Sequence, residues 1–291
     1  MVKLSHEVKE TLMRNGRYFA AAILAVIVLA GIVQAKPWVD EWTQKYLDQY
    51  EKDMDARTDL VVTSTTTATN IYMWRGFNML DDRAAIQPSI NLDWFGTGFS
   101  TTVWDSIVMK EGFGDKQEMR DTVGYTDVLW GDTQFATKYT ASWTYYDFVS
   151  MPSTERDAEE IGTQFSWPRV LIFGDTRFVP SYYVGKLWPA KSNAVNSDSG
   201  GWIHIFDLAY EFWVFGIGAE KQIAFLSAEA VYNDGMLGAD HKWSDVVFGA
   251  GTNYRDGAVT IRPEVKYQFS LDDKVDTKDQ VWGEITLSVK F

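Results

Sequence analysis

The sequence contains no cysteine and only three histidines, His6, His204 and His241. Without cysteine, the chain has no disulfide framework and no thiolate metal site. No nucleophile motif surrounds His204 or His241, which argues against a Ser-His-Asp hydrolase. Gly-rich phosphate loops, His-rich metal spacings and EF-hand patterns are also missing. The sequence therefore predicts no cofactor and no catalytic residue.

Basic residues are in deficit, with 27 Lys and Arg against 40 Asp and Glu and a net charge of −13. Binding to a phosphate backbone needs clustered Lys and Arg, so this balance argues against a nucleic-acid partner. Aromatic residues are abundant, with 13 Trp, 14 Tyr and 17 Phe. A soluble domain could hold them in its core, whereas transmembrane barrels place them in girdles at both membrane interfaces.

Long apolar runs are missing after the first 35 residues. The amino terminus combines basic residues with an uncharged apolar run over residues 19–33, and Val33-Gln34-Ala35 offers the small residues of a cleavage site. We expect residues 1–35 to be an export signal. A permanent membrane anchor is the alternative, although the run is shorter than the roughly 20 residues of a spanning helix. An exported chain that stays in a membrane without such helices must form a closed β-barrel.

Alternation of apolar and polar residues dominates the chain from residue 60 onward. In residues 281–291, the odd-numbered positions are Val, Gly, Ile, Leu, Val and Phe, whereas the even-numbered ones are Trp, Glu, Thr, Ser and Lys. This period of two predicts a strand with one face in apolar surroundings and the other in polar ones. We expect an all-β fold, a transmembrane antiparallel up-and-down barrel of about 12 strands over residues 60–291.

The expected connections between strands fall into two alternating classes. Tight turns rich in Gly, Asp and Asn are expected at Phe95–Gly98, Gly131–Asp132, Pro168–Asp175, Gly216–Gly218 and Tyr254–Gly257. Longer polar connections are expected near residues 106–120, 149–157, 187–200, 233–243 and 271–279. Short periplasmic turns and long external loops are typical of barrels in the Gram-negative outer membrane, whereas a soluble β-sandwich has no reason to segregate them.

Residues 36–59 follow a different period. Trp38, Trp42, Tyr46 and Tyr50 recur every fourth residue, which predicts a periplasmic amphipathic helix with an aromatic stripe. Three placements remain open for this helix. It would pack against the barrel mouth or membrane interface, plug the lumen, or dock a periplasmic partner or a second copy of the chain.

Three segments resemble the opening of the TorF-type porins of Gram-negative outer membranes. They are Tyr72-Met73-Trp74-Arg75-Gly76 within residues 69–77, Ala85-Ile86-Gln87 within residues 84–90, and Gly98-Phe99 with Trp104. The family shares Tyr-x-x-Arg-Gly, then Ala-x-Gln, then a Gly-Phe strand ending in Trp. Pro88 stands where the family usually carries Gly, and residues 36–59 look like an addition. The resemblance implies an outer-membrane barrel with a porin-like role, without a known substrate or catalytic residue.

The strand faces predict which residues line the lumen. Arg75-Gly76 is expected to close the first strand as a turn, with a positive φ at Gly76 and an inward ion pair at Arg75; a ligand contact is the alternative. The expected lumen-lining residues are Arg75, Gln87, Asn91, Asp93, Lys138, Glu160, Asp207, Glu211, Glu229, Arg262, Glu264, Lys266 and Glu284. Their acidic excess would favour cations in a channel. Alternatively, these carboxylates pair with lumen bases in a structural role.

The leading interpretation is passive diffusion of small polar solutes or ions through the barrel. The alternative is a closed structural or docking barrel that binds a partner through its loops or amino-terminal helix. Expected partners are outer-membrane lipid, lipopolysaccharide and, through Phe291, the barrel-assembly machinery. The acidic residues of the last loop are expected to be solvated, with binding of Ca²⁺ or of cation-linked lipopolysaccharide as the alternative. They are Asp272, Asp273, Asp276 and Asp279.

Overall fold

The computed structural model describes residues 59–109, 117–149, 153, 156–174, 176–191, 199–215 and 221–291. The expected export signal over residues 1–35 lies outside these residues. The expected amphipathic helix, apart from Asp59, lies outside them as well.

Long antiparallel strands make up almost all of the described chain. They are β1 (Val61–Thr69), β4 (Ala85–Asp93), β5 (Phe99–Val108), β6 (Glu118–Leu129), β7 (Thr137–Asp147), β8 (Ala158–Ser166), β10 (Thr176–Pro189), β11 (Gly201–Phe215), β12 (Lys221–Asp234), β13 (His241–Asp256), β14 (Val259–Ser270) and β15 (Gln280–Lys290). The short elements are β2 (Met73–Trp74), β3 (Phe77–Asn78), β9 (Leu171–Phe173) and a 3₁₀ turn, η3 (Met236–Gly238).

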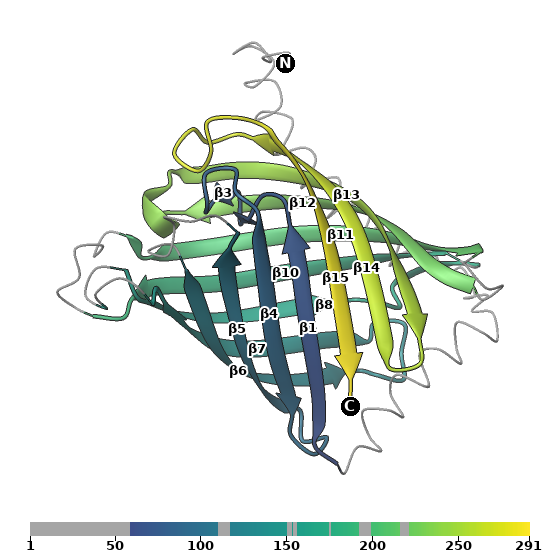
Figure 1. Cartoon of the computed structure of the whole chain (residues 1–291). Coiled ribbons are helices and arrows are strands. Elements are labelled where there is room, and N and C mark those ends of the chain that lie inside the picture. The colour runs from purple at the N-terminus through teal and green to yellow at the C-terminus, as the bar shows by residue number, and fades with distance from the viewer. Residues whose placement is uncertain are drawn as a thin grey trace.

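The long strands close into a barrel (Figure 1). Each pairs with its neighbours in the order given above, and β15 returns to pair with β1, so that Thr65 lies opposite Ser288. Of the 13 strands in this sheet, only β9 lies outside the ring, because it pairs with β10 alone. The prediction of a closed antiparallel barrel of 12 strands is therefore confirmed. Closure removes the free edges that the first and last strands would otherwise expose.

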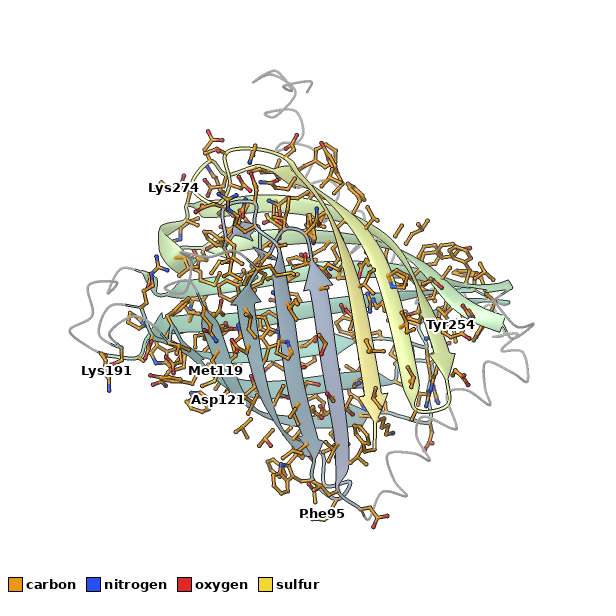
Figure 2. The ribbon with its side chains drawn as sticks, in the orientation of Figure 1. Phe95, Met119, Asp121, Lys191, Tyr254 and Lys274 are labelled. Atoms are coloured by element: carbon orange, nitrogen blue, oxygen red, sulfur yellow. The ribbon has the colours of Figure 1, made fainter. Side chains whose placement is uncertain are left out.

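Most connections are longer at one end of the barrel than at the other, although the β12–β13 connection at the long-loop end, residues 235–240, is shorter than the β6–β7 connection at the tight-turn end, residues 130–136. Phe95 lies in a tight turn at one end and Lys274 in a long loop at the other (Figure 2). Two further details differ from expectation. The expected tight turn at Pro168–Asp175 contains the short strand β9, and a further long connection, residues 70–84, joins β1 to β4. This last connection contains the β2–β3 hairpin, which packs against the inside of the barrel wall.

The outer surface of the barrel is apolar. Outward positions on β14 and β15 include Val265 and Ile285, whose exposed fractions are 60% and 58%. Exposed aromatic residues gather at the tight-turn end, at Phe95, Phe99, Trp130, Phe135 and Phe173. Among the described residues, no helix is long and apolar enough to cross a membrane. A closed barrel with an apolar belt and an aromatic girdle is the architecture of an outer-membrane protein, which places this chain in the outer membrane.

Candidate functional site

The hairpin β2–β3 forms because two consecutive residues adopt positive φ angles. Arg75 has φ of 53° and Gly76 has φ of 87°, the combination that a two-residue type I′ turn requires. The expectation that Arg75-Gly76 closes the first strand is wrong, since β1 already ends at Thr69. The expected positive φ at Gly76 is present. The Arg-Gly pair therefore builds a separate hairpin within the β1–β4 connection.

The tip of the hairpin packs against the opposite part of the barrel wall. Gln268 of β14 donates from Nε2 to the carbonyl oxygen of Gly76 at 3.0 Å. A Cβ atom at Gly76 would clash with Oδ2 of Asp245 and lie 2.8 Å from Cγ1 of Val275. Only glycine fits between these side chains, so the tip is held where β13, β14 and the last loop meet.

Arg75 anchors the hairpin to β8 and β10. Its Nη1 and Nη2 donate to Oε2 and Oε1 of Glu160 at 2.7 and 2.6 Å, a bidentate pair. Tyr146 donates to Glu160 Oε2 at 2.8 Å, and Tyr183 donates to Oε1. The arginine and glutamate side chains are 11% and 3% exposed, so the pair is buried. We name Arg75, Glu160, Tyr146 and Tyr183 the latch.

A second arginine lies beside the latch. Arg120 of β6 pairs with Glu118 at 2.5 Å, and its guanidinium carbon lies 4.9 Å from the Trp74 ring centroid and 4.3 Å from that of Trp104. Trp74 also packs against Tyr146, with ring centroids 5.5 Å apart. Two arginines and several rings thus fill this level of the lumen, where cation–π contacts add to the ion pairs.

Two cavities lie on either side of the hairpin, and Trp74 lines both of them. The outer cavity has a volume of about 690 Å³ and is lined by the β2–β3 hairpin, Tyr146, Phe148 and the loop over residues 273–278. The inner cavity has a volume of about 490 Å³ and is lined by inward residues of β11 to β15. The hairpin therefore separates a chamber next to the long loops from a chamber within the barrel.

The inner cavity is lined by five acidic and three basic residues. The acidic ones are Asp207, Glu211, Glu229, Glu264 and Glu284, and the basic ones are Arg75, Arg262 and Lys266. Most of these charges are paired. Arg262 contacts Glu264 at 3.1 Å, Lys266 contacts Glu284 at 3.1 Å, and Glu211 is bound by Arg177 at 2.5 Å. The expected pairing of carboxylates with lumen bases thus accounts for part of the acidic excess.

The expected lumen residues divide into two groups. Arg75, Asp207, Glu211, Glu229, Arg262, Glu264, Lys266 and Glu284 come together around the inner cavity, and Glu160 joins the latch. Gln87 and Asn91 instead bond hydroxyls of the neighbouring strand, Ser106 at 3.4 Å and Thr102 at 2.8 Å. Asp93 on β4 and Lys138 on β7 are not among the residues that line either cavity.

Sequence reasoning missed several residues that shape the lumen. Trp74 separates the cavities, Tyr146 and Tyr183 complete the latch, and Gln268 holds the hairpin tip. The inward parity of Tyr146 and Tyr183 on their strands could have identified them. Nothing in the sequence indicates that Gln268 meets Gly76, because this contact joins residues that are far apart along the chain.

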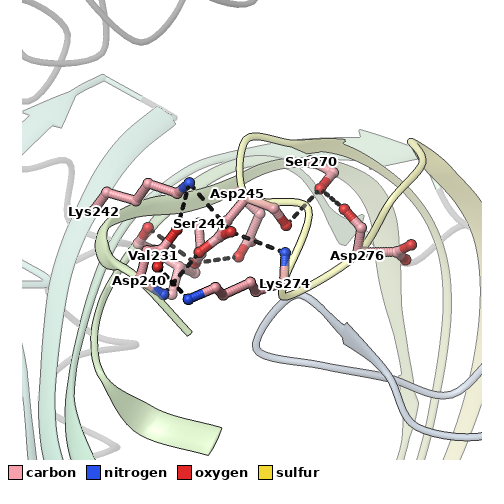
Figure 3. A network of polar contacts seen from close by, with 9 residues as sticks. Val231, Asp240, Lys242, Ser244, Asp245, Ser270, Lys274 and Asp276 are labelled. Carbon is pink, nitrogen blue, oxygen red and sulfur yellow. Dashed lines mark hydrogen bonds and ion pairs between the residues drawn. The ribbon is translucent and has the colours of Figure 1, made fainter. Parts of the chain in front are cut away.

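Two of the four acidic residues of the last loop, Asp272 and Asp276, are buried, which corrects the expectation for these two, whereas Asp273 is exposed as expected. Asp272 is only 1% exposed and accepts hydrogen bonds from the amides of Asp240 and Lys274 at 3.1 and 3.0 Å. Lys274 donates to Asp240 at 2.6 Å, and this hydrogen bond lowers the pKa of the Asp240 carboxyl (Figure 3). Carboxylates of the loop thus accept hydrogen bonds from its own backbone amides and pair with nearby lysines.

Each histidine of the described barrel contacts a polar side chain. His204 shares a hydrogen bond with the Tyr182 hydroxyl at 2.7 Å, and His241 contacts Asp234. In the part of the chain that the structure describes, no group of three or more His, Cys, Asp or Glu residues is arranged to hold a metal ion.

No protein-family profile and no curated protein matches the chain. Solved structures with a similar fold include the NanC porin, at 12% identity and a TM-score of 0.46, over 80% of this chain and 100% of that one. The β domain of the Bordetella autotransporter BrkA matches at 10% identity and a TM-score of 0.45, over 79% and 98% of the two chains. LpxR from Salmonella typhimurium matches at 9% identity and a TM-score of 0.45, over 79% and 99%. These likenesses carry no argument about function, and the resemblance to TorF-type porins rests on its motifs alone.

Proposed function

We propose that the chain is an outer-membrane channel for small polar solutes or ions, with a preference for cations. The observation that supports the proposal is the inner cavity, a charged space of about 490 Å³ inside a membrane-spanning barrel. A barrel that served only as a wall would fill this space with side chains that pack against one another. Charged side chains that line a cavity instead keep it hydrated and favourable for a polar solute.

The cation preference is inferred from the acidic excess around this cavity. After the ion pairs of Arg262, Lys266 and Arg177 are formed, Asp207 and Glu229 remain without a described ion pair. Unneutralised carboxylates in a surrounding of low dielectric constant attract cations and repel anions. The latch and hairpin lie in series with this cavity, so we expect a small conductance in the resting state.

The test is single-channel recording in planar lipid bilayers under a KCl gradient. We expect a measurable conductance and a reversal potential of cation-selective sign, which weakens at high salt as the fixed charges are screened. Anion selectivity would contradict the charge argument. Purified protein with residues 36–59 deleted serves as a control, because it reports whether that segment affects conduction.

A second candidate is a closed docking barrel, and the hairpin that crosses the lumen favours it. In that case, the long loops or the amino-terminal segment would bind a partner. The two candidates differ in one measurement. If neither the wild-type barrel nor an Arg75→Gln, Glu160→Gln double variant conducts, the docking barrel replaces the channel. Conductance that appears only in the double variant would instead identify a channel that the latch keeps closed.

A further inference from the structure

Four inward residues lie in one row across the wall of the inner cavity. In the strand register, Asp207 of β11 is the partner of Glu229 of β12, Glu229 is the partner of Val247 of β13, and Val247 is the partner of Gln268 of β14. All four line the inner cavity. The register therefore places two carboxylates and an amide at the same level of the lumen, around one space.

The two carboxylates of this row form a like-charged cross-strand pair. Such pairs are destabilising in sheets, because the side chains of directly opposed residues are close neighbours. Asp207 accepts one long hydrogen bond from Ser181 at 3.4 Å, and no hydrogen bond or ion pair within the described residues reaches Glu229. The neighbouring bases Arg262 and Lys266 are engaged by Glu264 and Glu284. The pair thus lacks a cation of its own.

Gln268 provides a second and independent observation. Its side chain is fully buried, at 0% exposure, and Nε2 is used for the carbonyl oxygen of Gly76. Among the described residues, no hydrogen-bond donor reaches its Oε1 atom. A buried acceptor without a donor is unfavourable, and a native structure normally supplies a partner for it. The row therefore combines two carboxylates that line the cavity with a buried amide oxygen that lacks a donor among the described residues.

We propose that the inner cavity binds a small organic cation that carries N–H donors, an ammonium or guanidinium compound. The cavity volume of about 490 Å³ lies in the range of small-molecule sites. Its wall includes the rings of Phe225 and Trp282, which suit the carbon skeleton of an organic cation better than a hydrated metal ion. This inference rests on the proposed function, since it names the class of solute that the channel would take.

The test is calorimetric titration of the purified barrel in detergent with agmatine, which carries an ammonium and a guanidinium group. Its control is 1,4-bis(trimethylammonio)butane, which has the same charge and no N–H donor. We expect the barrel to bind agmatine at one site and the control compound about tenfold more weakly or less. We also expect Glu229→Gln and, separately, Asp207→Asn to weaken agmatine binding by about tenfold.

A matched variant removes one negative charge outside the lumen. Asp127→Asn alters an exposed residue of β6 and is expected to leave agmatine binding unchanged. Heat-modifiable migration on gels reports whether each variant barrel is folded. Absence of agmatine binding to the folded wild type overturns the proposal, as does equal binding of the control compound. Binding of Ca²⁺ that Glu229→Gln abolishes, with no binding of agmatine, also overturns it.

Because the titration needs no membrane, it separates this proposal from the channel. Agmatine binding without conductance would refute the channel and retain the site. Conductance without agmatine binding would refute the site and retain the channel.

Discussion

The two halves of the lumen wall differ in chemistry. On β15, β1 and β4 to β7, inward hydroxyls bond one another between strands, as in Thr65 with Ser288 at 3.0 Å and Thr67 with Thr286 at 2.9 Å. The pairs Thr122–Thr144 and Thr126–Thr140 repeat this pattern at 3.0 and 2.9 Å. We name this half the hydroxyl wall. On β11 to β14, the charged wall carries Asp207, Glu229, Arg262, Glu264 and Lys266 toward the inner cavity.

This difference indicates where function resides in the barrel. Hydroxyls that satisfy each other across strands stabilise the sheet and leave few groups for a solute. On the charged wall, the cavity keeps carboxylates that no base neutralises. The hairpin arises from the hydroxyl wall, between β1 and β4, and reaches across to β8, β13 and β14. The hairpin therefore connects the two halves, because it arises from the hydroxyl wall and its tip is bound by Gln268 of the charged wall.

The largest effect is expected at the latch. Glu160→Gln leaves the buried Arg75 without its carboxylate, and breaking a buried ion pair in this way costs about 3–5 kcal/mol of unfolding free energy. Removing both charges with Arg75→Gln and Glu160→Gln should restore part of that loss. Denaturant unfolding in detergent measures the effect.

The charged wall offers a matched comparison for the latch. Arg177 and Glu211 also form an ion pair, but their side chains are 16% and 23% exposed. Glu211→Gln should therefore cost less unfolding free energy than Glu160→Gln, because more solvent reaches this carboxylate. Equal losses for Glu160→Gln and Glu211→Gln would contradict the view that the latch is a buried structural pair.

The next prediction compares a residue on the outer surface of the barrel with a residue of its hydroxyl wall. Leu287 is 44% exposed on the outer surface, whereas its neighbour Thr286 faces inward and bonds Thr67. Arginine on a lipid face costs about 2–4 kcal/mol near the membrane midplane, and lumen substitutions cost less. Leu287→Arg should impair folding into lipid vesicles far more than Thr286→Arg. Similar damage from both substitutions would mean that the assigned faces of β15 are wrong.

A third prediction concerns ion selectivity. Asp207→Asn combined with Glu229→Gln should shift the reversal potential in a KCl gradient toward zero, because it removes the unneutralised carboxylates of the charged wall. Thr67→Val changes the hydroxyl wall by one group of similar size and should leave the reversal potential unchanged. A larger shift from Thr67→Val than from the double variant would contradict the view that the charged wall determines ion selectivity.

The barrel could be predicted from the sequence because its signal is local. Alternation with a period of two, as in residues 281–291, records directly which side chains meet lipid and which meet the lumen. The same alternation placed Glu229, Glu264 and Glu284 on the inner side, where the structure has them.

The interior of the lumen could not be predicted in the same way. The contact between Gly76 and Gln268 and the pair of Arg75 and Glu160 join residues far apart in the chain, and their partners depend on how the barrel closes. The expectation of a solvated last loop is partly wrong, for a related reason. Its carboxylates suggest a solvated segment by composition, but Asp272 is buried by donors and lysines from other connections.

The smallest effect concerns the loop over residues 271–279, which joins the charged wall to the hydroxyl wall. Lys274 donates to Asp240 on one side at 2.6 Å, and Lys278 pairs with Asp82 on the other. Hydrogen bonds from these lysines lower the pKa of both aspartates below the ordinary 3.8. A depressed pKa stabilises the folded loop while the carboxylate is ionised. The contribution is therefore complete above pH of about 3.8 and is lost as the pH falls through the lower folded pKa values.

Acid should accordingly release this loop from both walls while the barrel stays intact. A spin label on Thr277→Cys, in a chain without other cysteines, reports loop mobility by electron paramagnetic resonance. Its mobility should stay constant from about pH 8 to about pH 5 and rise at pH values below about 3.8. A label on Asp132→Cys, in a tight turn at the other end, should show no such rise, because that turn does not depend on these ion pairs. A rise of equal size at both positions would indicate general unfolding and would contradict a local release of the loop.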